Sequence, residues 1–166
     1  MNLYLAYLGG RIFGGNIEIH DVQFVTGESI EQTYTTLKQR WIGDKNSVHL
    51  DSYIQLTDID GYKISLRETE QHSELKLFFV NLGGYRKDSL AEQHEFGLFV
   101  AKSSYEAKEK AMQQLLSNAQ LQHKDDLYDV DDCFRVSLLD LNYHIHLEPS
   151  GKNQVLHPDW FGYQVL

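Results

Sequence analysis

An internal repeat constrains this chain more than any other feature of its sequence. Four short motifs occur twice in the same order: Leu8-Gly9-Gly10 and Leu82-Gly83-Gly84, Glu18-x-His20 and Glu92-x-His94, His49-x-Asp51 and His123-x-Asp125, and Gly61-Tyr62-x-Ile64-x-Leu66 and Asn142-Tyr143-x-Ile145-x-Leu147. The first three pairs share one difference in residue number (82 − 8 = 94 − 20 = 123 − 49 = 74), and in the last pair this difference grows to 81 (143 − 62). A constant order of motifs at so long a period predicts a duplicated supersecondary unit.

Each copy is predicted to fold as β-β-α-β-β. In the first copy we expect strands at 3–8, 16–25, 48–56 and 62–66, and a helix from Ser29 whose apolar residues recur at helical spacing. Asp60-Gly61, between the last two strands, is typical of a hairpin turn. In the second copy we expect strands at 76–81, 92–100, 127–136 and 143–147, and a helix from Ser103 or Ser104.

These elements predict an α+β fold. The copies are expected at 1–68 and 74–148, and residues 149–166 are expected to form a C-terminal tail or an extra strand. Each copy has about 70 residues, a length at which an isolated core is marginal. We therefore expect the two copies to pack as a pseudo-twofold pair that buries a shared face.

The charge of the chain restricts its partners. The formal net charge is −9 and no dense lysine or arginine stripe offsets it, which disfavours nucleic acid and anionic membranes. No stretch approaches the ~20 apolar residues of a membrane span. The single cysteine, Cys133, excludes an intrachain disulfide and fits a cytoplasmic protein, whereas a small molecule or a metal ion is a compatible partner.

The Glu-x-His pairs are the first candidates for a site. Residues i and i+2 of a strand project from one face, so Glu18 points with His20, and Glu92 with His94. Imidazole and carboxylate together can bind zinc, manganese or iron, or can serve as general acid and base. The secondary candidates, which follow the same logic, are His49, Asp51, His123 and Asp125.

Structural roles compete with these site hypotheses. A histidine beside a glutamate on a strand can simply form a hydrogen bond that fixes its tautomer, and an aspartate can cap a turn. The Leu-Gly-Gly runs could expose backbone N–H groups to an anion, but adjacent glycines more often turn a strand or form a bulge, so a turn is favoured.

Several of these motifs together resemble one known family. They are Leu8-Gly9-Gly10-Arg11, Asn16-x-Glu18-x-His20-Asp21, His49-x-Asp51-Ser52, Asp60-Gly61-Tyr62, Asn81-Leu82-Gly83-Gly84-Tyr85, His123-Lys124-Asp125, His144-Ile145-His146-Leu147 and Pro158-Asp159-Trp160. The chain is similar over nearly its whole length to a bacterial family known as domain of unknown function 1543. This resemblance implies a duplicated α+β protein and carries no activity, substrate or cofactor.

Two functions are compatible with the sequence. The first is a binding or structural protein that takes a small molecule or a partner between the copies. The second is a metal-assisted or acid–base enzyme whose Glu18, His20, Glu92 and His94 share one site, where a metal would activate water and a carboxylate would move the proton. No particular reaction follows from these residues, so the binding protein is the preferred hypothesis.

Overall fold

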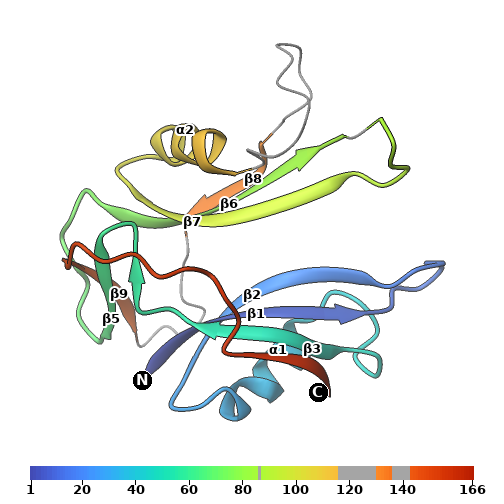
Figure 1. The fold of residues 1–166 in the computed structure, drawn as a ribbon. Helices are drawn as coiled ribbons and strands as arrows, with labels where there is room; N and C mark the ends of the chain where they lie inside the picture. Colours follow the sequence, from blue (N-terminus) through green and yellow to red (C-terminus); the bar gives the residue numbers. More distant parts are fainter. Residues whose placement is uncertain (86, 116–129, 136–142) are drawn as a thin grey trace. The chain divides into compact units, whose positions relative to one another are not determined.

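The computed structural model describes residues 1–85, 87–115, 130–135 and 143–166, and of 130–135 it describes the backbone alone. The chain divides into two compact units, one of residues 1–71 and 137–166 and one of residues 72–136. Both units combine antiparallel sheet with a helix, which makes the chain α+β (Figure 1).

The first unit contains a four-stranded sheet in the order β10-β3-β1-β2. Its strands are β1 (Asn2–Gly10), β2 (Ile19–Gly27), β3 (His49–Gln55) and β10 (Trp160–Val165). Every neighbouring pair is antiparallel. The C-terminal tail therefore supplies an edge strand that pairs with β3, the strand that carries His49.

The second unit repeats the central part of this sheet. Its strands β6 (Lys76–Gly84), β7 (Gln93–Ala101) and β8 (Val130–Arg135) lie in the order β7-β6-β8, which corresponds to β2-β1-β3. The pairing Gly83↔His94 repeats Gly9↔His20, so the first two strands keep the offset of the sequence repeat in the structure as well.

One helix covers one face of the main sheet in each unit (Figure 1). In the first unit a 3-10 turn, η1 (Glu31–Thr33), leads into α1 (Tyr34–Arg40), and the predicted apolar residues Ile30, Leu37 and Trp41 pack on alternate residues of β1. The helical segment is expected from Ser29, and the structure places its N-cap one residue later, at Ile30, with no side-chain cap hydrogen bond. In the second unit α2 (Ser104–Gln114) begins at the N-cap Ser103, whose hydroxyl oxygen accepts a hydrogen bond from the Glu106 N–H.

The predicted turn at Asp60-Gly61 is confirmed, but it joins two strands of a separate small sheet and does not pair the predicted strand 48–56 with 62–66. Asp60 has φ 52° and Gly61 has φ 87°, and the turn joins β4 (Asp58–Ile59) to β5 (Tyr62–Arg67). Two successive residues with positive φ are the requirement of a type I′ turn, whose twist matches antiparallel strands. Asp-Gly satisfies that requirement at low cost.

The last strands of the two sequence copies pair with each other. β5 is antiparallel to β9 (His144–Pro149), and Ser65 lies opposite His146, which is its own counterpart in the repeat (146 − 65 = 81). The pair Ile64↔Leu147 likewise maps onto Leu66↔Ile145 under the same offset. The pairing of these two strands is thus symmetric about a local twofold axis.

The strand register corrects one of the sequence matches. Leu8 pairs with Leu50 and Leu82 pairs with Val130, so the numbering offset between β3 and β8 is 80 (130 − 50) rather than 74. The difference is an insertion in the second copy between β7 and β8. His123-x-Asp125 is therefore not the structural counterpart of His49-x-Asp51, because equal spacing in sequence does not survive an insertion.

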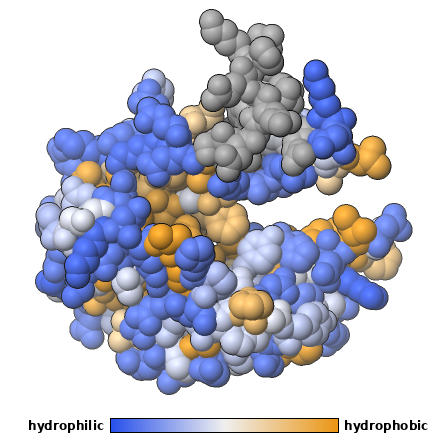
Figure 2. Space-filling view, in the orientation of Figure 1, coloured by the Kyte–Doolittle hydropathy of each residue, from blue (hydrophilic) through white to orange (hydrophobic). Residues whose placement is uncertain are grey.

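No helix in the described parts of the chain is long and apolar enough to cross a membrane. Hydrophilic residues cover most of the face drawn in Figure 2.

The packing of α1 generates a stability prediction. Leu37 is fully buried against β1, whereas Thr35 on the same helix is exposed. Leu37→Ala should lower the free energy of unfolding by about 2–5 kcal/mol, because it removes apolar contacts and leaves a cavity. The matched control Thr35→Ala should change it by less than about 0.5 kcal/mol. Urea denaturation measures both, and equal effects of the two variants would contradict the proposed core.

Candidate functional site

The pairing of β1 with its two neighbours brings two histidines to one place. Gly9 of β1 lies opposite His20 of β2 on one side and opposite His49 of β3 on the other. Directly paired residues project from the same face of a sheet, so both imidazoles lie on one face with Gly9 between them. This face is opposite the face that α1 covers, since Leu8 and Leu50 belong to the core beneath that helix.

Two adjacent glycines make room on the two faces. A Cβ on Gly9 would lie 2.5 Å from His49 Nε2 and 2.9 Å from Asp51 Oδ2, and a Cβ on Gly10 would lie 2.9 Å from the Trp41 ring. Both glycines are paired residues of β1, so the turn favoured from the sequence is wrong. The Leu-Gly-Gly run instead forms the end of β1. His49 and Asp51 lie close to one face of the strand there, and Trp41 lies close to the other.

Asp51 reaches the cluster from a β-bulge. Tyr7 pairs with Ser52 and Leu8 pairs with Leu50, which leaves Asp51 as the additional residue of β3. A bulge re-aims the side chain that it carries. Glu18 approaches from the segment just before β2, so four groups from three segments converge at one end of the sheet.

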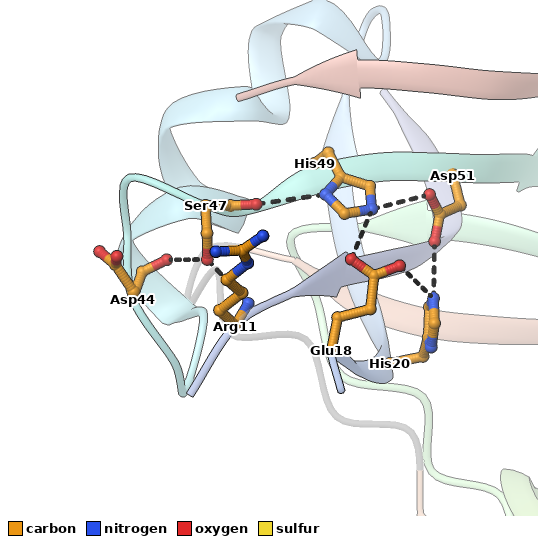
Figure 3. A network of polar contacts seen from close by, with 7 residues as sticks. All are labelled: Arg11, Glu18, His20, Asp44, Ser47, His49 and Asp51. Atoms are coloured by element: carbon orange, nitrogen blue, oxygen red, sulfur yellow. Dashed lines mark hydrogen bonds and ion pairs between the residues drawn. The ribbon is translucent and has the colours of Figure 1, made fainter. Parts of the chain in front are cut away.

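The four side chains form a closed ring of imidazole–carboxylate contacts (Figure 3). His20 Nε2 lies 3.6 Å from Glu18 Oε1 and 3.4 Å from Asp51 Oδ2. His49 Nε2 lies 3.9 Å from Glu18 Oε2 and 3.1 Å from Asp51 Oδ1. Each carboxylate therefore bridges both imidazoles through its two oxygens.

The second ring nitrogen of His49 fixes its orientation. Nδ1 is 3.2 Å from the Ser47 carbonyl oxygen, which can only accept a hydrogen bond, so Nδ1 carries the proton and Nε2 faces the carboxylates (Figure 3). Ser47 is itself held, because its hydroxyl oxygen accepts from the Arg11 N–H at 2.8 Å and its hydroxyl donates to the Asp44 carbonyl at 2.9 Å.

The four side chains of the ring differ in their exposure to solvent. The His49 side chain is 2% exposed, Asp51 25%, His20 38% and Glu18 46%. His49 is therefore the buried end of the cluster, and His20 and Glu18 form its open end. A small ligand would approach from the side of Glu18 and His20.

Two tyrosines flank the imidazoles. Tyr7 stacks on His20 with ring centroids 5.5 Å apart, and Tyr163 of β10 stacks on His49 at 4.1 Å. Burial raises the pKa of the Tyr7 phenol above its ordinary value, and the negative charges of Asp51 and Asp21 raise it further. Neither tyrosine was among the residues predicted from the sequence. Tyr7 lies two positions before Gly9 on the same strand face, so strand periodicity could have identified it.

In the second unit, His94 and Glu92 form a pair. His94 Nε2 is 3.7 Å from Glu92 Oε2, which confirms that the two side chains of this Glu-x-His motif also lie together. His123 and Asp125 lie outside the described residues. The sharing of one site by Glu18, His20, Glu92 and His94 stays a prediction, whereas Glu18, His20, His49 and Asp51 meet within the first unit alone.

Other polar groups have structural roles. His146 is buried, and its Nε2 is hydrogen-bonded to the Thr69 backbone oxygen. Within the residues that the structure describes, no three or more histidine, cysteine, aspartate or glutamate side chains form a ready-made metal-binding group. In the ring around Gly9 the imidazole nitrogens and carboxylate oxygens instead contact one another.

Comparisons with known proteins place the chain without assigning an activity. A family model described as Domain of Unknown Function (DUF1543) matches residues 15–66 and 89–139, once in each sequence copy. The crystal structure of a protein Il1583 from Idiomarina loihiensis is similar, with 38% sequence identity, a TM-score of 0.77, and coverage of 98% of this chain and 96% of that chain. No curated protein matches.

The close approach at Gly9 predicts a steric effect. Gly9→Ala should displace His49 and Asp51 and lower the free energy of unfolding by roughly 1–3 kcal/mol, because overpacking a fixed site forces neighbours to move. In a His49→Ala background the same substitution should cost less, since the ring it meets is gone. Urea denaturation of the four proteins of this cycle measures the coupling; additive effects would show that Gly9 and His49 do not interact.

The charge of Asp51 predicts a shift at Tyr7. Asp51→Asn should lower the pKa of the Tyr7 phenol, because it removes a negative charge that opposes ionisation, but burial should keep it above the ordinary 10.0. The phenolate absorbance of Tyr7 is obtained by subtracting the titration of Tyr7→Phe. Glu68→Gln removes an exposed carboxylate elsewhere in this unit and should leave the pKa of the Tyr7 phenol unchanged. A Tyr7 titration identical in the protein and Asp51→Asn would contradict the contact.

Proposed function

This chain belongs to the family described as Domain of Unknown Function (DUF1543), and from the geometry of its first unit we propose that it binds a small cationic ligand through Glu18, His20, His49 and Asp51. The observation that supports this function is the ring of two carboxylates and two imidazole nitrogens that face one another. We refer to these four residues as the His-carboxylate ring.

The charge of the ring favours a cation. Two carboxylates and two neutral imidazoles give a formal charge of −2 (two times −1). Carboxylates offer acceptors alone, and the Nε2 of a neutral His49 offers a lone pair because Nδ1 holds the proton. Lone pairs that face carboxylate oxygens at 3.1 and 3.9 Å repel each other unless a proton or another cation lies between them.

The position of the ring also supports a binding role. Stacking on Tyr7 and Tyr163 and the backbone contact at Ser47 hold the imidazoles before any ligand arrives. Preorganised groups lose less conformational entropy on binding than free ones. The exposed end at Glu18 and His20 gives a ligand access from solvent.

We extend the proposal to the organisation of the chain. The two sequence copies, 1–68 and 74–148, are two β-β-α-β-β units that form a pseudo-twofold pair, and residues 149–166 are a tail added to the first. The repeated order β2-β1-β3 and β7-β6-β8 supports this division, as does the symmetric pairing of β5 with β9.

A binding assay with simple cations tests the proposed function. Calorimetric titration of the full chain with ethylammonium, guanidinium, Mn²⁺ and Zn²⁺ should detect binding of at least one of them. Asp51→Asn should weaken that binding at least tenfold, because it removes one of the two carboxylates that contact both imidazoles and the less exposed of the two. Glu68→Gln removes the same charge from an exposed site and should leave the affinity within twofold. Binding that is equal in both variants would reject the ring as the site.

Acid–base catalysis is a second candidate because His20 is partly exposed and lies between two carboxylates. An imidazole oriented by a carboxylate is a common general acid or base. A panel of chromogenic esters, phosphates and glycosides would test it, with His20→Gln as the matched inactive variant. Turnover that persists in His20→Gln would exclude His20 from the chemistry.

A further inference from the structure

We propose that the cation held by the His-carboxylate ring is a divalent transition-metal ion, bound by Nε2 of His20, Nε2 of His49 and the carboxylates of Glu18 and Asp51. This inference rests on the proposed function and names the class of its ligand. It needs the first unit alone, since all four residues belong to it.

The orientation of His49 supports a metal ion. Its Nδ1–H donates to the Ser47 carbonyl, so Nε2, which faces the ring, is the nitrogen available to a metal ion. Metal-binding histidines almost always donate the other ring N–H to a backbone carbonyl or a carboxylate in this way, which fixes the tautomer and raises the basicity of the ligand nitrogen. The Ser47 carbonyl is in turn fixed through the loop, by contacts of Ser47 with Arg11 and Asp44.

The spacing of the donor atoms is compatible with a common ion. Ligand atoms about 2.0–2.1 Å from a tetrahedral metal ion lie about 3.3–3.4 Å from one another. The four N···O separations of the ring are 3.1, 3.4, 3.6 and 3.9 Å. Each separation involves a different carboxylate oxygen, so an ion within the ring would draw one oxygen of each carboxylate toward both nitrogens, and metal binding would replace the present N···O contacts with bonds to the ion.

The kinds of donor select among metal ions. Two imidazoles and two carboxylates suit Zn²⁺, Mn²⁺ and Fe²⁺, whereas Mg²⁺ and Ca²⁺ favour sites made wholly of oxygen. A divalent ion also neutralises the formal charge of −2 on the ring. Zn²⁺ should therefore bind more tightly than Mg²⁺.

The second sequence copy does not repeat this donor set. The register that relates β3 to β8 (130 − 50 = 80) places aspartates, Asp129 and Asp131, at the positions of His49 and Asp51. Asp129 lies outside the described residues, so this is a comparison of sequence positions. With a single imidazole at His94, the second copy lacks one nitrogen donor, and we expect one transition-metal ion per chain.

Metal titration of histidine variants tests the inference. The full chain, freed of any affinity tag and dialysed against chelator, should bind one Zn²⁺ per chain in calorimetry. His20→Gln and His49→Gln should each weaken Zn²⁺ binding at least tenfold, while His157→Gln, an exposed histidine on the loop before β10, should leave it within twofold. Co²⁺ bound in place of Zn²⁺ should give the visible absorption of a four-coordinate site and lose it in His20→Gln.

The outcomes separate this inference from the proposed function. Zn²⁺ affinity that is unchanged in His20→Gln would overturn the metal assignment. Binding of ethylammonium or guanidinium that Asp51→Asn removes, with no binding of Zn²⁺ or Mn²⁺, would overturn the metal assignment and keep the cation site. No binding of any of the four probes would overturn both. His20 is partly exposed, so His20→Gln carries the test if His49→Gln fails to fold.

Discussion

The pairing of β1 between β2 and β3 creates the candidate site. It places Gly9 opposite both His20 and His49, so two imidazoles from strands on either side of the helix in sequence meet on one face of one sheet. The absence of a side chain at Gly9 lets His49 and Asp51 lie over the strand, and its absence at Gly10 lets Trp41 pack beneath it. Two successive glycines of β1 thus contact the candidate site on one face of the sheet and the hydrophobic core on the other.

The His-carboxylate ring has properties that neither a hydrophobic core nor a simple surface ion pair shares. Exposed ion pairs contribute little to stability, because water screens them. Here one imidazole is buried, both carboxylates bridge both rings, and two tyrosines stack on the imidazoles. Such an arrangement costs free energy unless a cation neutralises it. The same groups that make the ring costly when empty would make it selective when occupied.

The two sequence copies share a fold plan and differ in what they carry. β7-β6-β8 repeats β2-β1-β3, and the bulge that carries Asp51 recurs in β8, where Asn81 pairs with Asp132 and Leu82 with Val130. The second copy nevertheless has Asn81 where the first has Tyr7, and no histidine at the position of His49. A duplicated framework thus leaves one copy free to lose or change a site while the backbone pairing is kept.

The order of amino acids was enough to predict the repeat, most of the strands and helices, the Asp60-Gly61 turn and the pairing of Glu18 with His20, because each depends on residues close together in the chain or on a fixed offset. The folded chain was needed to show that His49 and Asp51 join them, that Gly9 and Gly10 serve close approach, and that Tyr163 from the C-terminal strand stacks on His49. These features arise from strand register, and register is set by pairings between segments that are distant in sequence. A shift of the register by a single residue would move the side chains of a strand to the other face of the sheet.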